Sequence, residues 1–326
     1  MLLKQRLVQA SLLVVCSLGW QVNSMAQLVP EPDANIPRLA NGKPDLQGTW
    51  DFRTVTPMQR PEELGDIAIL SAEEAEEFEA QRIELLNRDN FTDTTTTGDY
   101  NDFWYDRGNE LDGDRRTSLI IDPPNGRIPP LTEEARTAQQ QRREAAELNL
   151  GIEVRPLAER CIMGFNSGPP MIPSAYNNNV QLVQAGDHLL IHNEMVHNVR
   201  IVRLNDTEHR DVPRKWEGDS IGYWDGDTLV VETRHFARDT AFGNSSANMN
   251  LVEKFWRIDD DTIAYEFTVE DPATWTQPWT AMFTMRKSVE PIYEYACHEG
   301  NYAMAGIMAG WRRLEVQEEL GLSPED

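Results

Sequence analysis

Positive charge, cysteine and histidine are all scarce in this sequence of 326 residues. The sequence contains 30 Lys and Arg but 54 Asp and Glu, so its formal net charge is −24 at pH 7. Such acidity argues against nucleic acid and anionic membrane surfaces as partners. The sequence also lacks a G-x-S-x-G motif and a phosphate-binding glycine loop, so neither a serine nucleophile of that kind nor a bound nucleotide is supported. The composition fits a soluble exported protein whose partner is a small-molecule ligand or substrate.

Long apolar runs are also absent, with one exception at the N-terminus. Two basic residues precede the run Leu7 to Trp20, and the small-x-small sequence Ser24-Met25-Ala26 follows it. This order predicts a secretory signal peptide over residues 1–26. Its removal would leave a formal charge of −26 and no run near the ~18 apolar residues of a membrane helix. We expect a periplasmic or secreted protein without a membrane span; a retained N-terminal anchor is the alternative.

Only two of the three cysteines, Cys161 and Cys297, lie beyond this leader. An even pair in an oxidising compartment predicts one disulfide. The bond would close a loop of 137 residues and stabilise the fold by about 4–5 kcal/mol on the chain-entropy model. It would also tie His298 and Glu299 to the segment just before the β-hairpin predicted over residues 176–203. Two separate buried thiols are the alternative.

From residue 160 the chain reads as short strands separated by turns every eight to twelve residues, a pattern typical of a sandwich or barrel. The connections are too short for crossover helices, so an antiparallel meander is expected and a parallel sheet is not. We predict a mainly β fold in which residues 151–326 form a barrel with a C-terminal helix. The later expected elements are strands 220–224, 228–236, 251–258, 262–270, 279–287 and 291–297, and a helix over 300–320 that packs closely on the barrel through its small residues.

Residues 27–150 are predicted to form an N-terminal extension that packs on the barrel. Gly48-Thr49-Trp50 begins a short strand, and residues 116–122 form another. Ser71-Ala72-Glu73-Glu74 has capping-box chemistry and opens a helix of about fifteen residues. A second polar helix runs from Thr132 to about Leu148. The aromatic cluster over 101–105 either anchors the core or lines a barrel mouth.

Two local patterns resemble known β folds. The G-x-W at Trp50 resembles the first strand of lipocalins and related barrels, which implies that the tryptophan closes the barrel base under an arginine. A lipocalin-like barrel is therefore the expected architecture. The spacing of Gly186, His192 and Glu194 resembles the first cupin motif, although a second cupin motif is absent. A cupin-like jelly roll is the alternative.

The stretch from Tyr176 to Arg203 holds three of the six histidines and the alternation of a β-hairpin. Successive strand side chains point to opposite faces, so His192 and Glu194 are expected on one face, with His197 in the turn that follows. The spacing H-x-E-x-x-H differs from the zincin H-E-x-x-H, and histidines five apart lie about 140° apart around a helix. A helical zinc site is therefore not expected.

A site built from this hairpin has three explanations. Imidazole and carboxylate groups suit one divalent Zn, Fe, Mn or Cu ion. Without a metal, His298 and a carboxylate could act as general acid and base. Structural hydrogen bonds are the third explanation. The candidate metal ligands are His192, Glu194, His197 and His298. Of these, His192, Glu194 and His298 are also catalytic candidates.

Carboxylates also occur on the predicted strands. Glu253 shares a face with Phe255 and Arg257, whereas Glu232 and Glu266 lie opposite apolar faces of their own strands. These polar faces either point to solvent or line a polar lumen, where burial would perturb carboxylate pKa values. In the second case Glu253 and Glu266 join the catalytic candidates. The candidate substrate-binding residues are Tyr176, Asn177, Asn178 and Arg200.

Several longer blocks resemble a family of secreted bacterial proteins over nearly the whole mature chain. The resemblance implies secretion and supplies no mechanism. Our functional hypothesis is acid–base or metal-assisted chemistry on a small organic molecule, of the lyase, hydratase or isomerase type. The alternatives are a non-catalytic carrier or sensor of an apolar ligand, and a structural protein whose lumen is filled by Trp and Phe. The blocks are GTW, RTSLIIDPPNGRIPPLT, YNNN, HNEMVH, WDGDTLVVET, DDDTIAYEFTVEDP and YEYACHEGN.

Overall fold

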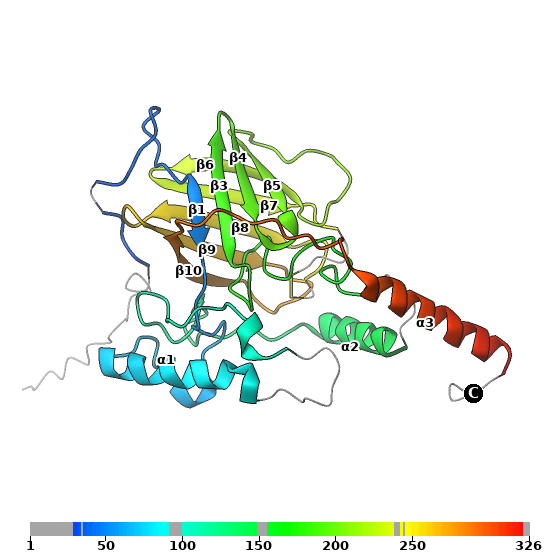
Figure 1. Ribbon diagram of the computed structural model, residues 1–326. Helices are drawn as coiled ribbons and strands as arrows, with labels where there is room; N and C mark the ends of the chain where they lie inside the picture. The colour runs from blue at the N-terminus through cyan, green and yellow to red at the C-terminus, as the bar shows by residue number, and fades with distance from the viewer. Residues whose placement is uncertain are drawn as a thin grey trace, which may run out of the picture.

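A closed barrel of nine strands organises the chain (Figure 1). The computed structural model describes residues 29–33, 35–90, 100–148, 155–237, 242–243 and 245–321. The predicted signal peptide, residues 1–26, lies outside this part of the chain. No helix of the described part combines the length and the apolar character that crossing a membrane requires.

The barrel is mainly antiparallel, as the alternating pattern predicted. Its strands are β1 (Gly48–Asp51), β3 (Asn179–Ala185), β4 (His188–Asn193), β5 (Val199–Leu204), β6 (Asp219–Asp225), β7 (Thr228–Arg234), β8 (Asn250–Arg257), β9 (Thr262–Glu270) and β10 (Trp279–Lys287). They pair in this order, and β1 closes the ring on β10 through Trp50 and Lys287. A short strand outside the ring, β2 (Ile120–Asp122), pairs with β10. The region predicted as an extension therefore supplies the closing strand.

One pairing departs from the predicted meander. β5 and β6 are parallel, with Val202 beside Ser220, because residues 205–218 return along the barrel before β6 begins. A parallel pair needs a connection of about a dozen residues or more, and this segment is long enough. The prediction that every connection is too short for a parallel pair was wrong at this junction.

The inside of the ring is a packed core. Trp50 from the G-x-W is fully buried, its Nε1 donates to the carbonyl oxygen of Leu46 at 2.9 Å, and the Arg257 guanidinium lies 4.9 Å from its ring centroid. This is the arginine-covered tryptophan that the lipocalin resemblance implied. Other large side chains that fill the ring are Phe52, Phe255, Tyr265, Phe267, Trp279 and Phe283.

The strand glutamates divide between the two faces. Glu253 is fully buried and alternates with the core residues Leu251 and Phe255, so it points into the ring. Glu266, a predicted catalytic residue, points outward and pairs across strands with Lys254, whose Nζ lies 2.7 Å from its carboxylate. Of the two alternatives for the strand carboxylates, Glu266 therefore lies on the outer face of the barrel and Glu253 points into its interior.

Two predicted helices precede the main run of strands. In the first, the Ser71 hydroxyl accepts from the Glu74 N–H while the Glu74 carboxylate accepts from the Ser71 N–H, which is the expected capping box. Its Phe78 packs in a small cluster with Leu111, so the helix rests on loops and not on a strand face. The two helices are α1 (Ala72–Leu86) and α2 (Glu133–Leu148).

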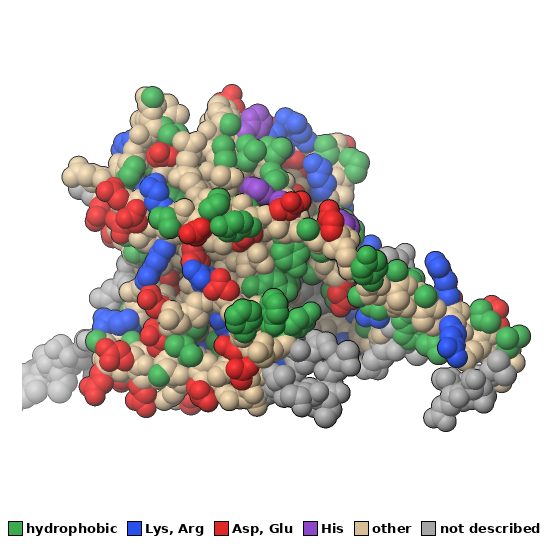
Figure 2. Space-filling view, viewed as in Figure 1, with side chains coloured by type: hydrophobic (Ala, Val, Ile, Leu, Met, Phe, Trp, Pro, Cys, Tyr) green, Lys and Arg blue, Asp and Glu red, His purple; other side chains and the backbone are tan. Residues whose placement is uncertain are grey.

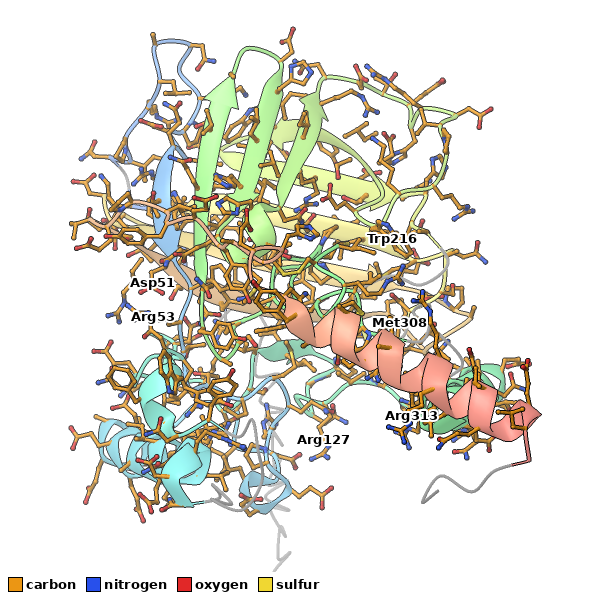
Figure 3. All side chains as sticks on the ribbon, turned by 45° about the vertical axis from the view of Figure 1, so that its right-hand side comes forward. Asp51, Arg53, Arg127, Trp216, Met308 and Arg313 are labelled. Atoms are coloured by element: carbon orange, nitrogen blue, oxygen red, sulfur yellow. A yellow bond between two sulfur atoms is a disulfide. The ribbon has the colours of Figure 1, made fainter. Side chains whose placement is uncertain are left out.

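The C-terminal part differs from its prediction. Residues 288–301, here called the strap, form no strand, because β10 is already paired with β9, β1 and β2 and the ring leaves it no edge. The last helix, α3 (Tyr302–Glu319), projects from the barrel, with Met308 and Arg313 along it (Figure 3). Gly306 and Gly310 have nothing within 4 Å of an added Cβ. The predicted close packing of this helix on the barrel was therefore wrong.

Candidate functional site

His192 lies on the outer face of β4. Its neighbours Ile191 and Asn193 are buried on the inner face, and His192 Nδ1 lies 3.5 Å from Oε1 of Gln181 on β3. Burial and the neighbouring His197 lower the pKa of His192 below its usual value of about 6.5. This lowered pKa favours the neutral ring, which can accept a proton. A catalytic role for His192 stays a prediction.

Glu194 lies beyond the strand that was expected to carry it. β4 ends at Asn193, and Glu194 has helical backbone angles, φ −64° and ψ −43°. The strand alternation that placed it on the face of His192 therefore stops before it. Its side chain is buried, and its carboxylate accepts a hydrogen bond of 2.6 Å from Asn179 Nδ2. This contact ties the turn after β4 to the start of β3.

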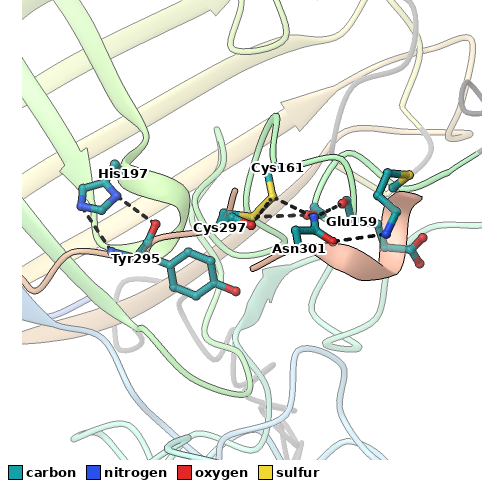
Figure 4. The surroundings of a disulfide bond; sticks show 8 residues. Glu159, Cys161, His197, Tyr295, Cys297 and Asn301 are labelled. Carbon is teal, nitrogen blue, oxygen red and sulfur yellow. Dashed lines mark hydrogen bonds between the residues drawn. A yellow bond between two sulfur atoms is a disulfide. The ribbon is translucent and has the colours of Figure 1, made fainter. Parts of the chain in front are cut away.

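The four predicted metal ligands do not form one group. His197 engages the backbone of Tyr295 with both ring nitrogens: Nδ1 lies 3.1 Å from the carbonyl oxygen, and the Tyr295 N–H donates to Nε2 at 3.3 Å (Figure 4). The rings of His192 and His197 are 6.2 Å apart, and His298 is exposed on the strap. Among the described residues, no three His, Cys, Asp or Glu side chains are placed to hold a metal. The set of His192, Glu194, His197 and His298 does not fit a divalent ion, and a bound metal stays a prediction.

Glu253 and Arg200, predicted as catalytic and substrate-binding, form a buried ion pair inside the ring. Both terminal nitrogens of Arg200 donate to the Glu253 carboxylate, one of them at 2.7 Å. The hydroxyl of Tyr265 donates to the same carboxylate at 2.7 Å and accepts from the Met171 N–H at 3.1 Å. Arg200 also donates to Thr233 Oγ1 at 3.2 Å. These contacts within the ring favour a structural role for the pair. The catalytic role of Glu253 and the substrate-binding role of Arg200 stay predictions.

The predicted substrate-binding residues before β3 separate into two roles. Asn178 is buried, and its Nδ2 donates to the carbonyl oxygens of Asp106 and Ser174 at 3.1 and 2.9 Å. Its amide therefore holds the loop together. Asn177 has a left-handed backbone with φ 54°, which forms the turn into β3. Tyr176, in contrast, faces other aromatic rings, with its centroid 5.4 Å from that of Phe165.

Exposed aromatic side chains gather at one end of the barrel in a group here called the aromatic platform. Phe103, Trp104 and Tyr100 are 81%, 62% and 58% exposed, so Phe103 and Trp104 do not anchor the core. Figure 2 shows hydrophobic side chains on this face between the barrel and the helices below it. Exposed apolar groups of this kind mark binding surfaces. The platform consists of Tyr100, Phe103, Trp104, Tyr105, Phe165 and Tyr176.

The platform gives Tyr176 an unusual titration. Burial, followed by the neighbouring Tyr295, raises the pKa of Tyr176 to about 12, compared with about 10 for a free tyrosine. The unfolded chain therefore loses this proton first, and stability is expected to fall between about pH 10 and about pH 12. In an ultraviolet titration of phenolate absorbance, Tyr176→Phe should remove one phenol from the step near pH 12. The matched variant Tyr223→Phe, on the outer face of β6, should leave that step in place; an unchanged step in Tyr176→Phe would contradict this environment.

A cleft adjoins both the platform and the disulfide. Cys161 and Cys297 are bonded, as predicted, and the bond fixes the strap to the segment at 155–163 (Figure 4). The cleft between them has a volume of about 820 Å³, and the first turns of α3 form its third wall. The side chains that matter for its chemistry are Tyr100, Arg155, Glu159, Glu294, Tyr295 and Glu299.

The polar groups of the cleft are partly engaged with one another. Arg155 lies 3.6 Å from the Glu159 carboxylate, and Asn301 Nδ2 donates to the Glu159 carbonyl oxygen at 3.4 Å. The Nε of Arg155 is buried and has no hydrogen-bond partner among the described residues. The cleft therefore combines two tyrosine side chains with the partly exposed guanidinium group of Arg155.

The sequence matches no protein-family model and no curated protein. The resemblance to a secreted bacterial family stays a prediction. The cysteine pair and the aromatic run at 101–105 signalled this end of the barrel in the sequence. Arg155 and Glu159 gave no such signal, because they stand in an ordinary polar stretch.

Proposed function

We propose that this is an exported small-molecule-binding protein whose ligand occupies the cleft beside the disulfide. The observation that carries the proposal is the cleft itself, about 820 Å³ in volume and walled by Tyr100, Tyr295 and a disulfide. Ligand sites in proteins commonly measure about 300–1,000 Å³ and combine aromatic walls with a few polar groups. A disulfide agrees with an oxidising compartment, which supports export.

The packed ring favours this site over a lipocalin-type lumen. A carrier of that type holds its ligand among inward-pointing side chains. Here Phe267, Phe283 and Trp279 occupy such positions, fully or almost fully buried, and the ion pair of Arg200 and Glu253 is buried in the same ring. The proposed ligand therefore binds outside the ring, where the exposed rings of the platform also lie.

The walls suggest how a ligand would be held. Tyr100 and Tyr295 offer aromatic surfaces for a flat ring, since aromatic pairs contribute about 0.5–1.5 kcal/mol beyond simple burial. The guanidinium of Arg155, whose side chain is 24% exposed, offers N–H donors to an acceptor oxygen. A small phenol meets both requirements.

Calorimetric titration with 4-tert-butylphenol tests the proposal. Tyr100→Ala is expected to weaken binding about tenfold through lost ring contact and lost burial. Tyr223→Ala removes a tyrosine that is also exposed but lies on the outer face of β6, outside the cleft lining. This control should leave the affinity within about twofold. Equal affinity in both variants, or no binding to the unaltered protein, would contradict the proposal.

A further inference from the structure

The charges of the cleft are unequal. Three carboxylates, those of Glu159, Glu294 and Glu299, line it with a single cation, Arg155. The 3.6 Å ion pair joins Arg155 to Glu159. Glu294 and Glu299 form no ion pair with any residue in the described part of the chain. The described lining therefore carries an excess of two negative charges.

The aromatic walls add to this preference for positive charge. A tyrosine ring has a negative face, which attracts a cation placed over it within about 6 Å of the ring centroid. The protein already uses this contact on the platform, where the Arg107 guanidinium lies 4.4 Å from the Tyr105 ring centroid. Tyr100 and Tyr295 offer the same surface to the cleft.

The field of the whole molecule acts in the same direction. A formal charge of −24 raises the local concentration of cations and lowers that of anions around the protein. An anionic ligand would have to approach through this field and compete with Glu159 for Arg155. The cleft is less suited to binding a bare metal ion, because the described residues offer no group of three ligating side chains.

We infer that the cleft selects a small organic cation, an aromatic or alkyl ammonium compound, over neutral molecules of the same shape. The ammonium group lies near Glu294 and Glu299, and the ring or alkyl part lies against the tyrosines. The inference rests on the proposed function, because it names the class of ligand for the same cleft.

An isosteric pair of probes separates charge from shape. The (4-hydroxyphenyl)trimethylammonium ion and 4-tert-butylphenol have the same outline and differ by one positive charge. Calorimetric titration should show about tenfold tighter binding of the cation. The difference should shrink as NaCl rises from about 0.05 M to about 0.5 M, because salt screens the exposed carboxylates.

Two double variants then separate the cleft from the general field. Glu294→Gln with Glu299→Gln should reduce the affinity for the cation about fivefold or more and leave that for 4-tert-butylphenol within about twofold. The control, Glu208→Gln with Glu270→Gln, removes the same total charge from exposed positions elsewhere and should change neither affinity.

The outcomes distinguish the two proposals. Equal affinity of both probes would overturn the selection of cations and leave the proposed function standing. A cation preference that both double variants reduce equally would assign it to the net charge and overturn the role of the cleft. Binding of neither probe would overturn the proposed function, and the inference with it.

Discussion

Replacing Glu253 with Gln is expected to reduce the free energy of unfolding by about 3–5 kcal/mol. The variant keeps the shape of the side chain and removes its charge. The Arg200 guanidinium then loses its ion-pair partner in the core, and the other carboxylate that attracts it, Glu217, lies too far away to form an ion pair. Arg200 is only 4% exposed and Glu253 is not exposed at all, so water can solvate the unpaired charge only poorly. Urea denaturation followed by circular dichroism measures the change, and the slope with denaturant should stay constant.

The matched control is Glu266→Gln on the neighbouring strand. It is the same chemical change, but Glu266 pairs on the outer face with Lys254, which is 43% exposed and can be solvated when its partner, itself 11% exposed, loses its charge. Pairs of that kind contribute about 0–1 kcal/mol. A similar loss in both variants would contradict the assignment of Glu253 to the core.

A charge-free replacement refines the test. Arg200→Met combined with Glu253→Leu removes both charges, and buried ion pairs replaced by apolar groups often lose little stability. The double variant should therefore be more stable than Glu253→Gln alone. If it is less stable, the hydrogen bonds to Tyr265 and Thr233 contribute more than the charges do.

Removing the disulfide has the second large expected effect. Cys161→Ala with Cys297→Ala releases a bond across a sequence separation of 136, and the chain-entropy model predicts a loss of about 4–5 kcal/mol. The strap is then held to the barrel by weaker contacts, such as the hydrogen bonds between His197 and Tyr295. The affinity of the cleft for 4-tert-butylphenol should fall about tenfold or more, since one wall is no longer fixed.

Reduction supplies the control for this variant. Dithiothreitol should reproduce both losses in the unaltered protein and have no effect on the variant that lacks this cysteine pair. Unchanged unfolding energy would contradict the stabilising role of the bond. Lost stability with unchanged affinity would contradict its role in framing the cleft.

Local patterns were sufficient to predict much of the fold. Alternation over 262–270 and 279–287 gave strands with the observed bounds, because the side chains that face the core are apolar and recur at every second position. Ser71 and Glu74 predicted the helix start through chemistry confined to one turn. The cysteine pair predicted the disulfide because only two cysteines followed the predicted leader.

Features set by distant contacts could not be predicted in the same way. Nothing local shows that 291–297 lacks a strand partner, since that depends on β1 having closed the ring on β10. Arg200 and Glu253 are 53 residues apart, and their pairing follows from the ring geometry. The cleft likewise joins residue 100, the segment near 155 and the strap, which the disulfide brings together.

Crystals soaked with 4-tert-butylphenol give the most direct test of the central claim, that the ring is filled and the ligand binds outside it. The account predicts difference density between Tyr100 and Tyr295, beside the disulfide and within reach of Arg155. Density inside the ring, among Phe267, Phe283 and Trp279, would contradict it and restore the lipocalin-type carrier as the function.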